Sequence, residues 1–301
     1  MLSSKKQKRK GELMKINILD THKLYCEMMS LPDKDRAEFF DKKLLEPFAP
    51  MFEKTMMPRN PEAMSCLALS GVDDIANGML NQLMVANVWN EARRVIETAM
   101  NDLQKVGIKI PEKTTLGIFL GNPQMLSQSE GYFGVGSIPG YIQIIIAPNE
   151  KNLSKLNSCV AHEFHHNALF FNVKWNFMNI TLSQYLAVEG MAESFASALY
   201  GKDCVGPWVT SVTGRDLETS RKIVSKSLDT AGFLEVRNYI FGKHPMVPGS
   251  EALGIPYCGG YAVGYHAVKA YLRKTGRTIA ETTKAFIDGA DVVKQSDYCT
   301  Q

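Results

Sequence analysis

The sequence of 301 residues lacks several features that would place it in a class at once. No stretch approaches the roughly 18 consecutive apolar residues of a membrane-spanning helix, so we expect no transmembrane segment. The six cysteines are scattered and form no CxxC pair, which argues against a cysteine-based zinc site and a dense disulfide framework. No apolar run follows the basic N-terminus, so a secretory signal is not visible. Together these absences favour a cytoplasmic protein in a reducing compartment.

The chain also lacks a large excess of charge of either sign, because its formal net charge is only +3. Residues 1–13 hold five lysines and arginines against one glutamate, so this segment carries more net positive charge than the whole chain. The rest is close to neutral and lacks the broad basic field that attracts nucleic acid, so no nucleic-acid partner is expected. We interpret residues 1–13 as a solvated basic tail or leader. The alternative is that this cluster binds nucleic acid or another anionic surface.

The composition is that of a globular protein, with 45% hydrophobic and 22% charged residues. Residues 14–110 are predicted to be helical and carry no chemical motif, and an amphipathic pattern predicts one long helix over 73–106. Beyond residue 110, short β-branched and apolar runs predict strands over 115–120, 132–136 and 141–147.

Helical patterns dominate the rest of the chain. They predict helices over 153–171, 181–200, 216–228 and 259–272, and a last helix that begins near 278. Capping-box signatures at Thr181 and Thr278 mark two of these helix starts, because each threonine is followed three residues later by a glutamine or glutamate. The fold class we expect is therefore α+β, mostly helical with a small mixed β-sheet. We divide the chain into the tail, an N-terminal helical region (14–110) and a domain (111–301).

One motif carries clear chemistry, the sequence His-Glu-Phe-His-His at residues 162–166, which has the form HExxH. Residues four apart on an α-helix share a face, so His162 and His166 can bind one metal ion together. Glu163 can then act as general base toward a water whose pKa a zinc ion lowers from about 16 to about 7. A coincidental polar stripe is the alternative. The otherwise apolar helix weakens it, since unpaired polar groups are costly to bury.

A second helix supplies a candidate third ligand. Glu189 follows His166 after a gap of 22 residues, which is enough for a helix end, a loop and a return along a neighbouring helix. Glu193 lies one turn further on the same face, and we assign it to hydrogen-bonding a ligand imidazole. Two imidazoles and a carboxylate suit Zn²⁺, with one coordination position left open. The alternative is that both glutamates are simply solvated.

These blocks resemble a known family. The strand, the HExxH helix and the second helix with its glutamate resemble the gluzincin metallopeptidases. The combination of HEFHH, EGMAESFA and GGYAVGYHAVKAYL is similar to the DUF2268 family, predicted zinc-dependent proteases of the YjaZ type, over about residues 110–290. The resemblance implies a gluzincin-like catalytic core, with the sheet packed on the HExxH helix, that hydrolyses a peptide or protein substrate. A metal-bearing, non-catalytic interaction module is the alternative, and the oligomeric state stays open.

The resemblance also implies roles for other residues. The hydroxyl of Tyr261, or else that of Tyr265, would donate to the oxyanion formed at the attacked carbonyl. Alternatively, both tyrosines belong to a packing stripe. The glycine-interrupted strand around Gly134, Val135 and Gly136 would pair with an extended peptide, unless its glycines mark a bulge. The acidic residue with which aminopeptidase relatives hold a substrate amine is not evident near this strand.

Overall fold

A single mixed β-sheet organises the N-terminal half of the protein in the computed structural model, which describes residues 14–243 and 249–299. Its strands are β1 (Lys15–Ile18), β2 (Lys113–Leu120), β3 (Tyr132–Val135) and β4 (Tyr141–Ile146), in the spatial order β1-β2-β4-β3. The first three strands in this order run parallel, whereas β3 pairs antiparallel with β4 at one edge. The strand β3 therefore has one edge that no other described strand occupies.

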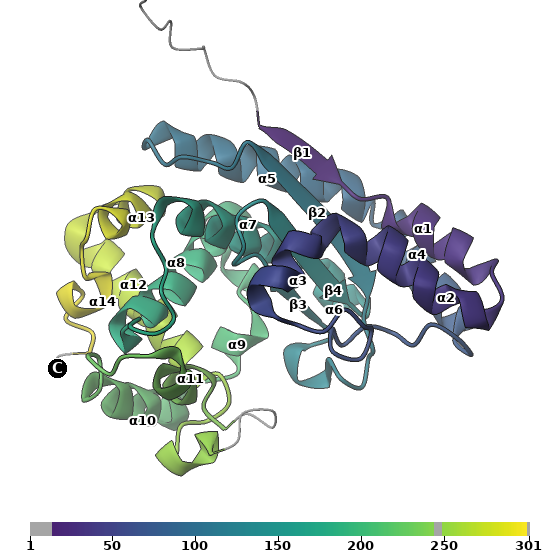
Figure 1. The fold of residues 1–301 in the computed structure, drawn as a ribbon. Helices are drawn as coiled ribbons and strands as arrows, with labels where there is room; N and C mark the ends of the chain where they lie inside the picture. Colours follow the sequence, from purple (N-terminus) through teal and green to yellow (C-terminus); the bar gives the residue numbers. More distant parts are fainter. Residues whose placement is uncertain (1–13, 244–248, 300–301) are drawn as a thin grey trace, which may run out of the picture.

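Helices surround the sheet and form the whole C-terminal half (Figure 1). Those before β2 are α1 (Thr21–Met29), α2 (Asp33–Phe39), the π-helix η1 (Phe40–Leu45), the 3₁₀ turn η2 (Glu46–Phe48), α3 (Ala49–Thr55), α4 (Asp73–Val85) and α5 (Val88–Lys105). Those after β2 are η3 (Ser127–Ser129), α6 (Glu150–Leu153), α7 (Leu156–Asn172), α8 (Leu182–Tyr200), η4 (Lys202–Cys204), α9 (Pro207–Thr210), α10 (Gly214–Ser225), α11 (Phe233–Phe241), η5 (Ser250–Leu253), α12 (Gly259–Thr275), α13 (Ile279–Ile287) and α14 (Val292–Gln295).

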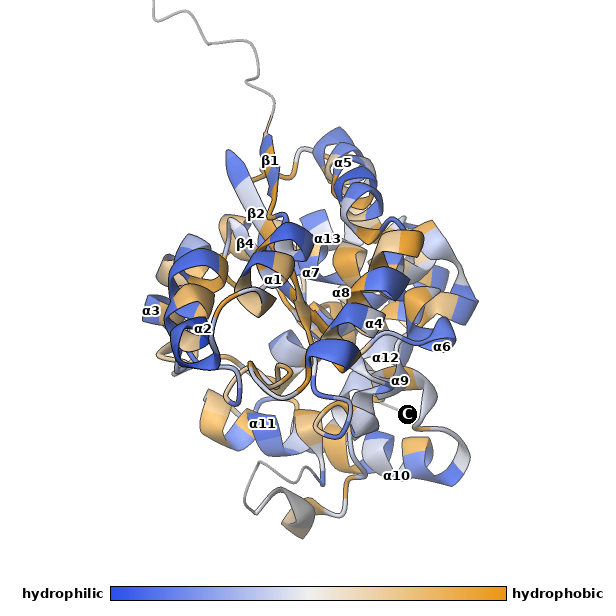
Figure 2. Ribbon diagram, turned by 90° about the vertical axis from the view of Figure 1, so that its right-hand side faces the viewer, coloured by the Kyte–Doolittle hydropathy of each residue, from blue (hydrophilic) through white to orange (hydrophobic). Residues whose placement is uncertain are grey.

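The sheet is buried on both faces, as its composition requires. From Ile142 onward, every residue of β4 is buried, and a strand without alternation between apolar and polar residues needs cover on each side. Helix α7 packs against one face. On the other, Phe48 meets Phe119 and Tyr141 at ring distances of 5.7 and 6.3 Å. Figure 2 shows the middle of the sheet as hydrophobic, whereas peripheral helices such as α5 carry much hydrophilic surface.

The expected fold class, mostly helical with a small mixed sheet packed on the HExxH helix, is confirmed at this level. The three predicted strands beyond residue 110 appear as β2, β3 and β4. Both predicted capping boxes form, at the starts of α8 and α13. None of the helices in residues 14–243 and 249–299 combines the length and the apolar character needed to cross a bilayer.

Two predictions about residues 14–110 were wrong in detail. Residues 15–18 form β1 rather than helix, because Ile16 and Ile18 alternate with polar residues and the strand finds a parallel partner in β2. The single helix predicted over 73–106 is split into α4 and α5. The break lies at Asn87, whose φ of +54° is left-handed, a conformation that asparagine tolerates better than most residues.

Three helices form the layer that carries the site. Helix α8 packs against both α7 and α12. Glycines make the second contact unusually close, because a Cβ on Gly190 would lie 2.2 Å from the carbonyl oxygen of Gly264. A Cβ on Gly264 would in turn lie 2.4 Å from the carbonyl oxygen of Leu186. No side chain fits between these backbones, and the close crossing brings the start of α12 toward the middle of α8.

Candidate metal centre

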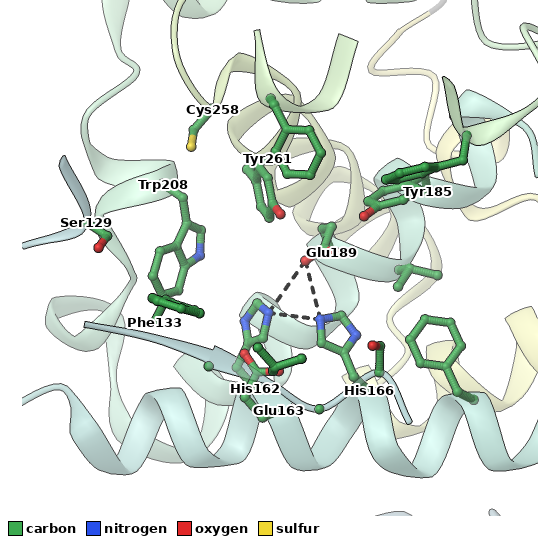
Figure 3. A pocket seen from close by; sticks show the side chains of 18 of the residues that line it. Ser129, Phe133, His162, Glu163, His166, Tyr185, Glu189, Trp208, Cys258 and Tyr261 are labelled. Atoms are coloured by element: carbon green, nitrogen blue, oxygen red, sulfur yellow. Dashed lines mark hydrogen bonds and ion pairs between the residues drawn. The ribbon is translucent and has the colours of Figure 1, made fainter. Parts of the chain in front are cut away.

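Three side chains from two neighbouring helices converge on one point (Figure 3). His162 and His166 come from α7, and their Nε2 atoms lie 3.0 Å apart. Glu189 reaches them from α8, with its Oε2 atom 3.5 Å from Nε2 of His162 and 3.3 Å from Nε2 of His166. All three side chains are almost completely enclosed. This convergence is the geometry that a shared divalent cation requires.

The hydrogen bonds around His162 fit a metal ligand. Its Nδ1 atom donates to Oε2 of Glu193 over 3.0 Å, because an ionised carboxylate can only accept. Glu193 is held in place by two further donors, the backbone N–H of Gly206 and Nε1 of Trp208, each at 2.7 Å. With Nδ1 engaged by Glu193, Nε2 is the ring nitrogen of His162 that faces Glu189 and is left to bind a metal ion. Carboxylates commonly orient metal-binding histidines in this way.

The electrostatics of the cluster favour a positive charge between these groups. Burial by itself would raise the pKa of Glu189, but the charge of His166 and hydrogen bonds from both imidazoles lower this pKa to about 2. Burial likewise opposes protonation of His162, yet Glu189 and Glu193 raise its pKa well above the ordinary value. The same excess of negative charge suits a divalent cation held by two neutral imidazoles and one carboxylate. The donor set therefore fits zinc.

Glu163 lies beside the cluster without joining it. It is 6% exposed and borders the same cavity as His162, His166 and Glu189. Burial raises the pKa of its carboxyl group, and the neighbouring imidazoles oppose this effect only in part. Glu163 is therefore placed to exchange a proton with a molecule in the cavity.

The strand β3 passes directly over Glu163. A Cβ on Gly134 would lie 2.3 Å from Cγ of Glu163, and a Cβ on Gly136 would lie 2.3 Å from its backbone oxygen. Only glycine allows this approach, so these glycines reflect contact with Glu163. Gly134, Val135 and Gly136 all line the cavity, as expected for a strand beside the site.

The segment after β3 is held to α7 by Asn167, a residue that the sequence analysis did not single out. Its side chain is fully buried, and Nδ2 donates to the carbonyl oxygens of Gly136 (2.8 Å), Ile138 (3.0 Å) and Tyr141 (2.8 Å). Its Oδ1 accepts from the backbone N–H of Gly140 at 2.6 Å. The side-chain amide of Asn167 thus fixes the position of the chain after β3 relative to the HExxH helix, α7. The only available signal was a polar residue directly after the motif in an apolar helix.

The cavity above the cluster has a volume of about 320 Å³ and opens between α7, α8, β3 and the start of α12. In Figure 3, Trp208, Phe133 and Ser129 lie on the side of His162, and the hydroxyl groups of Tyr261 and Tyr185 point toward Glu189. Trp208 and Tyr185 were not expected at the site. Their sequence contexts hold no motif that would have identified them.

Tyr265 is the predicted catalytic candidate that the structure does not bring to this cavity. It lies one turn beyond Tyr261 on α12, and its ring contacts His266 (5.5 Å between centroids) and Lys269 (5.9 Å from Nζ). Residue 265 directly follows the close crossing of α12 and α8 at Gly264, but its side chain contacts these two side chains and does not line the cavity. His165 also faces elsewhere, with its Nε2 atom 2.8 Å from Oγ1 of Thr283.

Comparison with known proteins agrees with this site. The family model described as "Predicted Zn-dependent protease (DUF2268)" matches residues 88–289, and the chain belongs to this family. The chain is also 32% identical over 289 residues to "Uncharacterized protein YjfC" of Bacillus subtilis (strain 168), an alignment that covers 91% of this chain and 96% of that protein. No solved structure matches the chain. The resemblance expected from the three sequence blocks is thereby confirmed, and the match begins at the first residue of α5.

Proposed function

We propose that this protein is a zinc metallopeptidase of the gluzincin type that hydrolyses peptide bonds. One observation carries the proposal: His162, His166 and Glu189 converge beside a buried glutamate, Glu163, that is not part of the cluster. A purely structural zinc site is closed by four protein ligands, whereas a catalytic one leaves a position open toward a cavity. Here three candidate ligands border a cavity of about 320 Å³.

The proposed roles follow from the contacts. His162, His166 and Glu189 would hold the zinc ion, and Glu193 keeps the imidazole of His162 in the required tautomer. When bound, zinc supplies a Lewis acid that favours ionisation of water and polarisation of a carbonyl group. Glu163 accepts the proton of the attacking water and passes it to the leaving amine.

The substrate would bind as an extended chain along β3. The free edge of this strand offers backbone hydrogen bonds through Gly134 and Val135, a recognition mode that any extended peptide can use, and Gly136 borders the cavity directly after them. Tyr261 donates a hydrogen bond from its hydroxyl group to the oxyanion that develops at the attacked carbonyl. Tyr261 is preferred because it lines the cavity and its hydroxyl points toward Glu189 (Figure 3).

All of these residues lie within 111–301, which we propose as the metallopeptidase domain, with 14–110 as an N-terminal, mostly helical region that also contributes β1 to the sheet. The basic segment 1–13, expected to be a tail or leader, lies outside the described residues. We also propose a cytoplasmic location. It is supported by the six cysteines, all of which are free, since free thiols persist in reducing compartments.

The proposal is tested by zinc content and peptide cleavage together. Wild-type protein is expected to bind one equivalent of zinc and to cleave a mixed peptide library. Glu163→Gln should retain the metal and lose about 10²–10⁴-fold in rate, the usual contribution of a general base. Glu189→Ala should lose the metal as well. Glu150→Gln, which changes an exposed glutamate on α6, is the matched control and should leave both properties unchanged.

Two results would count against this mechanism. Cleavage that persists at the wild-type rate in Glu163→Gln, with contaminating peptidases excluded, would rule out the general base. A wild-type protein that binds zinc tightly and cleaves no peptide would instead favour a metal-bearing interaction module.

A further inference from the structure

The cavity has an apolar end beside His166. Five rings form this end, and we call them the aromatic wall: Phe170, Trp175, Phe177, Tyr185 and Phe233. They come from four parts of the chain, namely α7, the segment between α7 and α8, α8 itself and α11.

The rings of the aromatic wall contact one another in series. Phe170 stacks on His166, with centroids 5.8 Å apart and planes at 21°. Trp175 meets Phe170 at 4.9 Å and Tyr185 at 6.3 Å. Phe233 then contacts Tyr185 at 6.0 Å and Phe177 at 5.5 Å. The wall is therefore a continuous surface that starts at a candidate metal ligand and leads outward.

Part of this surface is open to solvent. Phe177 is 51% exposed although it lines the cavity. Large apolar groups gathered at the mouth of a cavity are costly to leave in water, and they commonly mark a place where a ligand binds. Because the wall continues directly into the candidate metal centre, the ligand that fits it is part of the molecule that binds there.

Charged groups that would recognise a chain terminus are scarce in the same cavity. Among the residues that the structure describes, no lysine or arginine lines it, so nothing there would pair with a terminal carboxylate. Its carboxylates are those of Glu163 and Glu189, both of which already have roles in the proposed mechanism. This lining favours internal peptide bonds over bonds next to either terminus.

We propose that the aromatic wall is a subsite for a bulky apolar side chain, preferably an aromatic one, on one of the two residues that flank the cleaved bond. The substrate class is then an internal, extended and apolar segment of a peptide or protein. This inference rests on the proposed function. On β3 the cavity is lined by Phe133, Gly134 and Val135, and Gly136 follows directly after the strand. Beside Glu163 this part of the chain therefore presents mainly backbone, whereas the aromatic wall presents bulky apolar side chains at the end of the cavity beside His166.

The first test is the cleavage pattern. Zinc-loaded wild-type protein is incubated with a mixed peptide library, and the cleaved bonds are mapped by mass spectrometry. We expect Phe, Tyr, Trp, Leu and Met to be enriched at one position flanking the cleaved bond, and cleavage to fall mainly within peptides rather than at their ends. Cleavage without such enrichment would overturn the subsite and leave the proposed function intact.

The second test uses matched pairs of neighbouring residues. Phe177→Ala and Phe233→Ala shorten the wall, whereas Met178→Ala and Leu234→Ala remove side chains that are 85% and 68% exposed and do not line the cavity. The wall variants should lower kcat/KM about tenfold or more for a peptide with Phe at the selected position, since even one methylene in an apolar pocket changes it by about 10–200-fold. For the same peptide with Ala there, kcat/KM should change less than twofold.

A binding measurement separates the subsite from catalysis. In the zinc-loaded Glu163→Gln background, the Phe-containing peptide with a fluorescent label should bind more tightly than its Ala counterpart, as measured by anisotropy. Adding Phe177→Ala should remove that difference, and adding Met178→Ala should preserve it. Circular dichroism and zinc content confirm that each variant is folded. An equal loss with Phe177→Ala and Met178→Ala, or no difference between the peptides, would overturn the subsite, whereas a wild type that cleaves no peptide would overturn the proposed function.

Discussion

Glu193 offers the sharpest test of how the fold prepares a metal ligand. Its carboxylate accepts three hydrogen bonds, from Nδ1 of His162 (3.0 Å), Nε1 of Trp208 (2.7 Å) and the backbone N–H of Gly206 (2.7 Å). The side chain is only 2% exposed, so water cannot replace a lost acceptor. In Glu193→Gln, one carboxylate oxygen becomes an NH₂ group. Whichever way the amide turns, that group faces at least one N–H donor.

The expected magnitude follows from this mismatch. Losing a hydrogen bond to a buried charged group costs roughly 1.5–3 kcal/mol. If the amide nitrogen faces Nδ1 of His162, the tautomer that points Nε2 at the metal is no longer favoured. When a metal-binding histidine loses the group that hydrogen-bonds its other ring nitrogen, metal binding typically weakens by about 10–100-fold, or about 1.4–2.7 kcal/mol. Trp208→Phe removes one donor from Glu193 but leaves the contact with His162, so its effect should be smaller than tenfold.

The assay is a zinc competition titration against a chromophoric chelator of known affinity, done at one pH on protein shown to be folded by circular dichroism. Glu235→Gln, at an exposed glutamate of α11, serves as the matched control and should bind zinc like the wild type. A folded Glu193→Gln protein with wild-type zinc affinity would show that the amide oxygen still accepts from Nδ1 of His162, whereas a folded Glu193→Ala protein with wild-type zinc affinity would refute the claim that Glu193 orients His162.

Three further predictions concern other parts of the structure. Gly136→Ala places a Cβ 2.3 Å from the backbone oxygen of Glu163 and should lower the unfolding free energy by about 1–3 kcal/mol, measured in urea. Asn167→Asp removes both N–H donors of Nδ2, which lie against three carbonyl oxygens, so it should raise KM for peptides and lower stability by about 3 kcal/mol or more, while zinc affinity stays within about threefold. For Glu130, burial raises the pKa but Lys151 and Lys155 outweigh it and hold the pKa below its usual value. Glu130→Gln should therefore cost up to about 1 kcal/mol at pH 7. This difference should disappear as the pH falls through that lowered pKa.

Each of these predictions has a result that contradicts it. Unchanged stability in Gly136→Ala would show that the chain directly after β3 does not lie against Glu163 as described. If folded Asn167→Asp loses as much zinc affinity as peptide affinity, Asn167 acts on the metal site rather than on the chain after β3. A stability difference for Glu130→Gln that persists at pH 2 would exclude the ionised carboxylate as its cause.

Much of the candidate site follows from local sequence patterns. The spacing of His162 and His166 places them on one face of any α-helix, and the same periodicity aligns Glu189 with Glu193. Tyr265 shows where this reasoning stops, because periodicity puts it on the same face as Tyr261 and says nothing of which turn meets the site. The strand β1 was missed for a related reason. It pairs with β2, whose residues lie 98 positions further along the chain, and no local pattern in the sequence indicates that pairing.

The sequence by itself determined the motif, the helices that carry it, the three strands beyond residue 110 and the family. Those features depend on residues within a few positions of each other, whose geometry the helix and strand periods fix. Only the tertiary structure decided that α8 brings Glu189 to the two imidazoles, that Asn167 fastens the chain after β3, and that rings from four segments form the aromatic wall. Such contacts join residues far apart in the chain, and they exist because close packing allows few arrangements of these helices and strands.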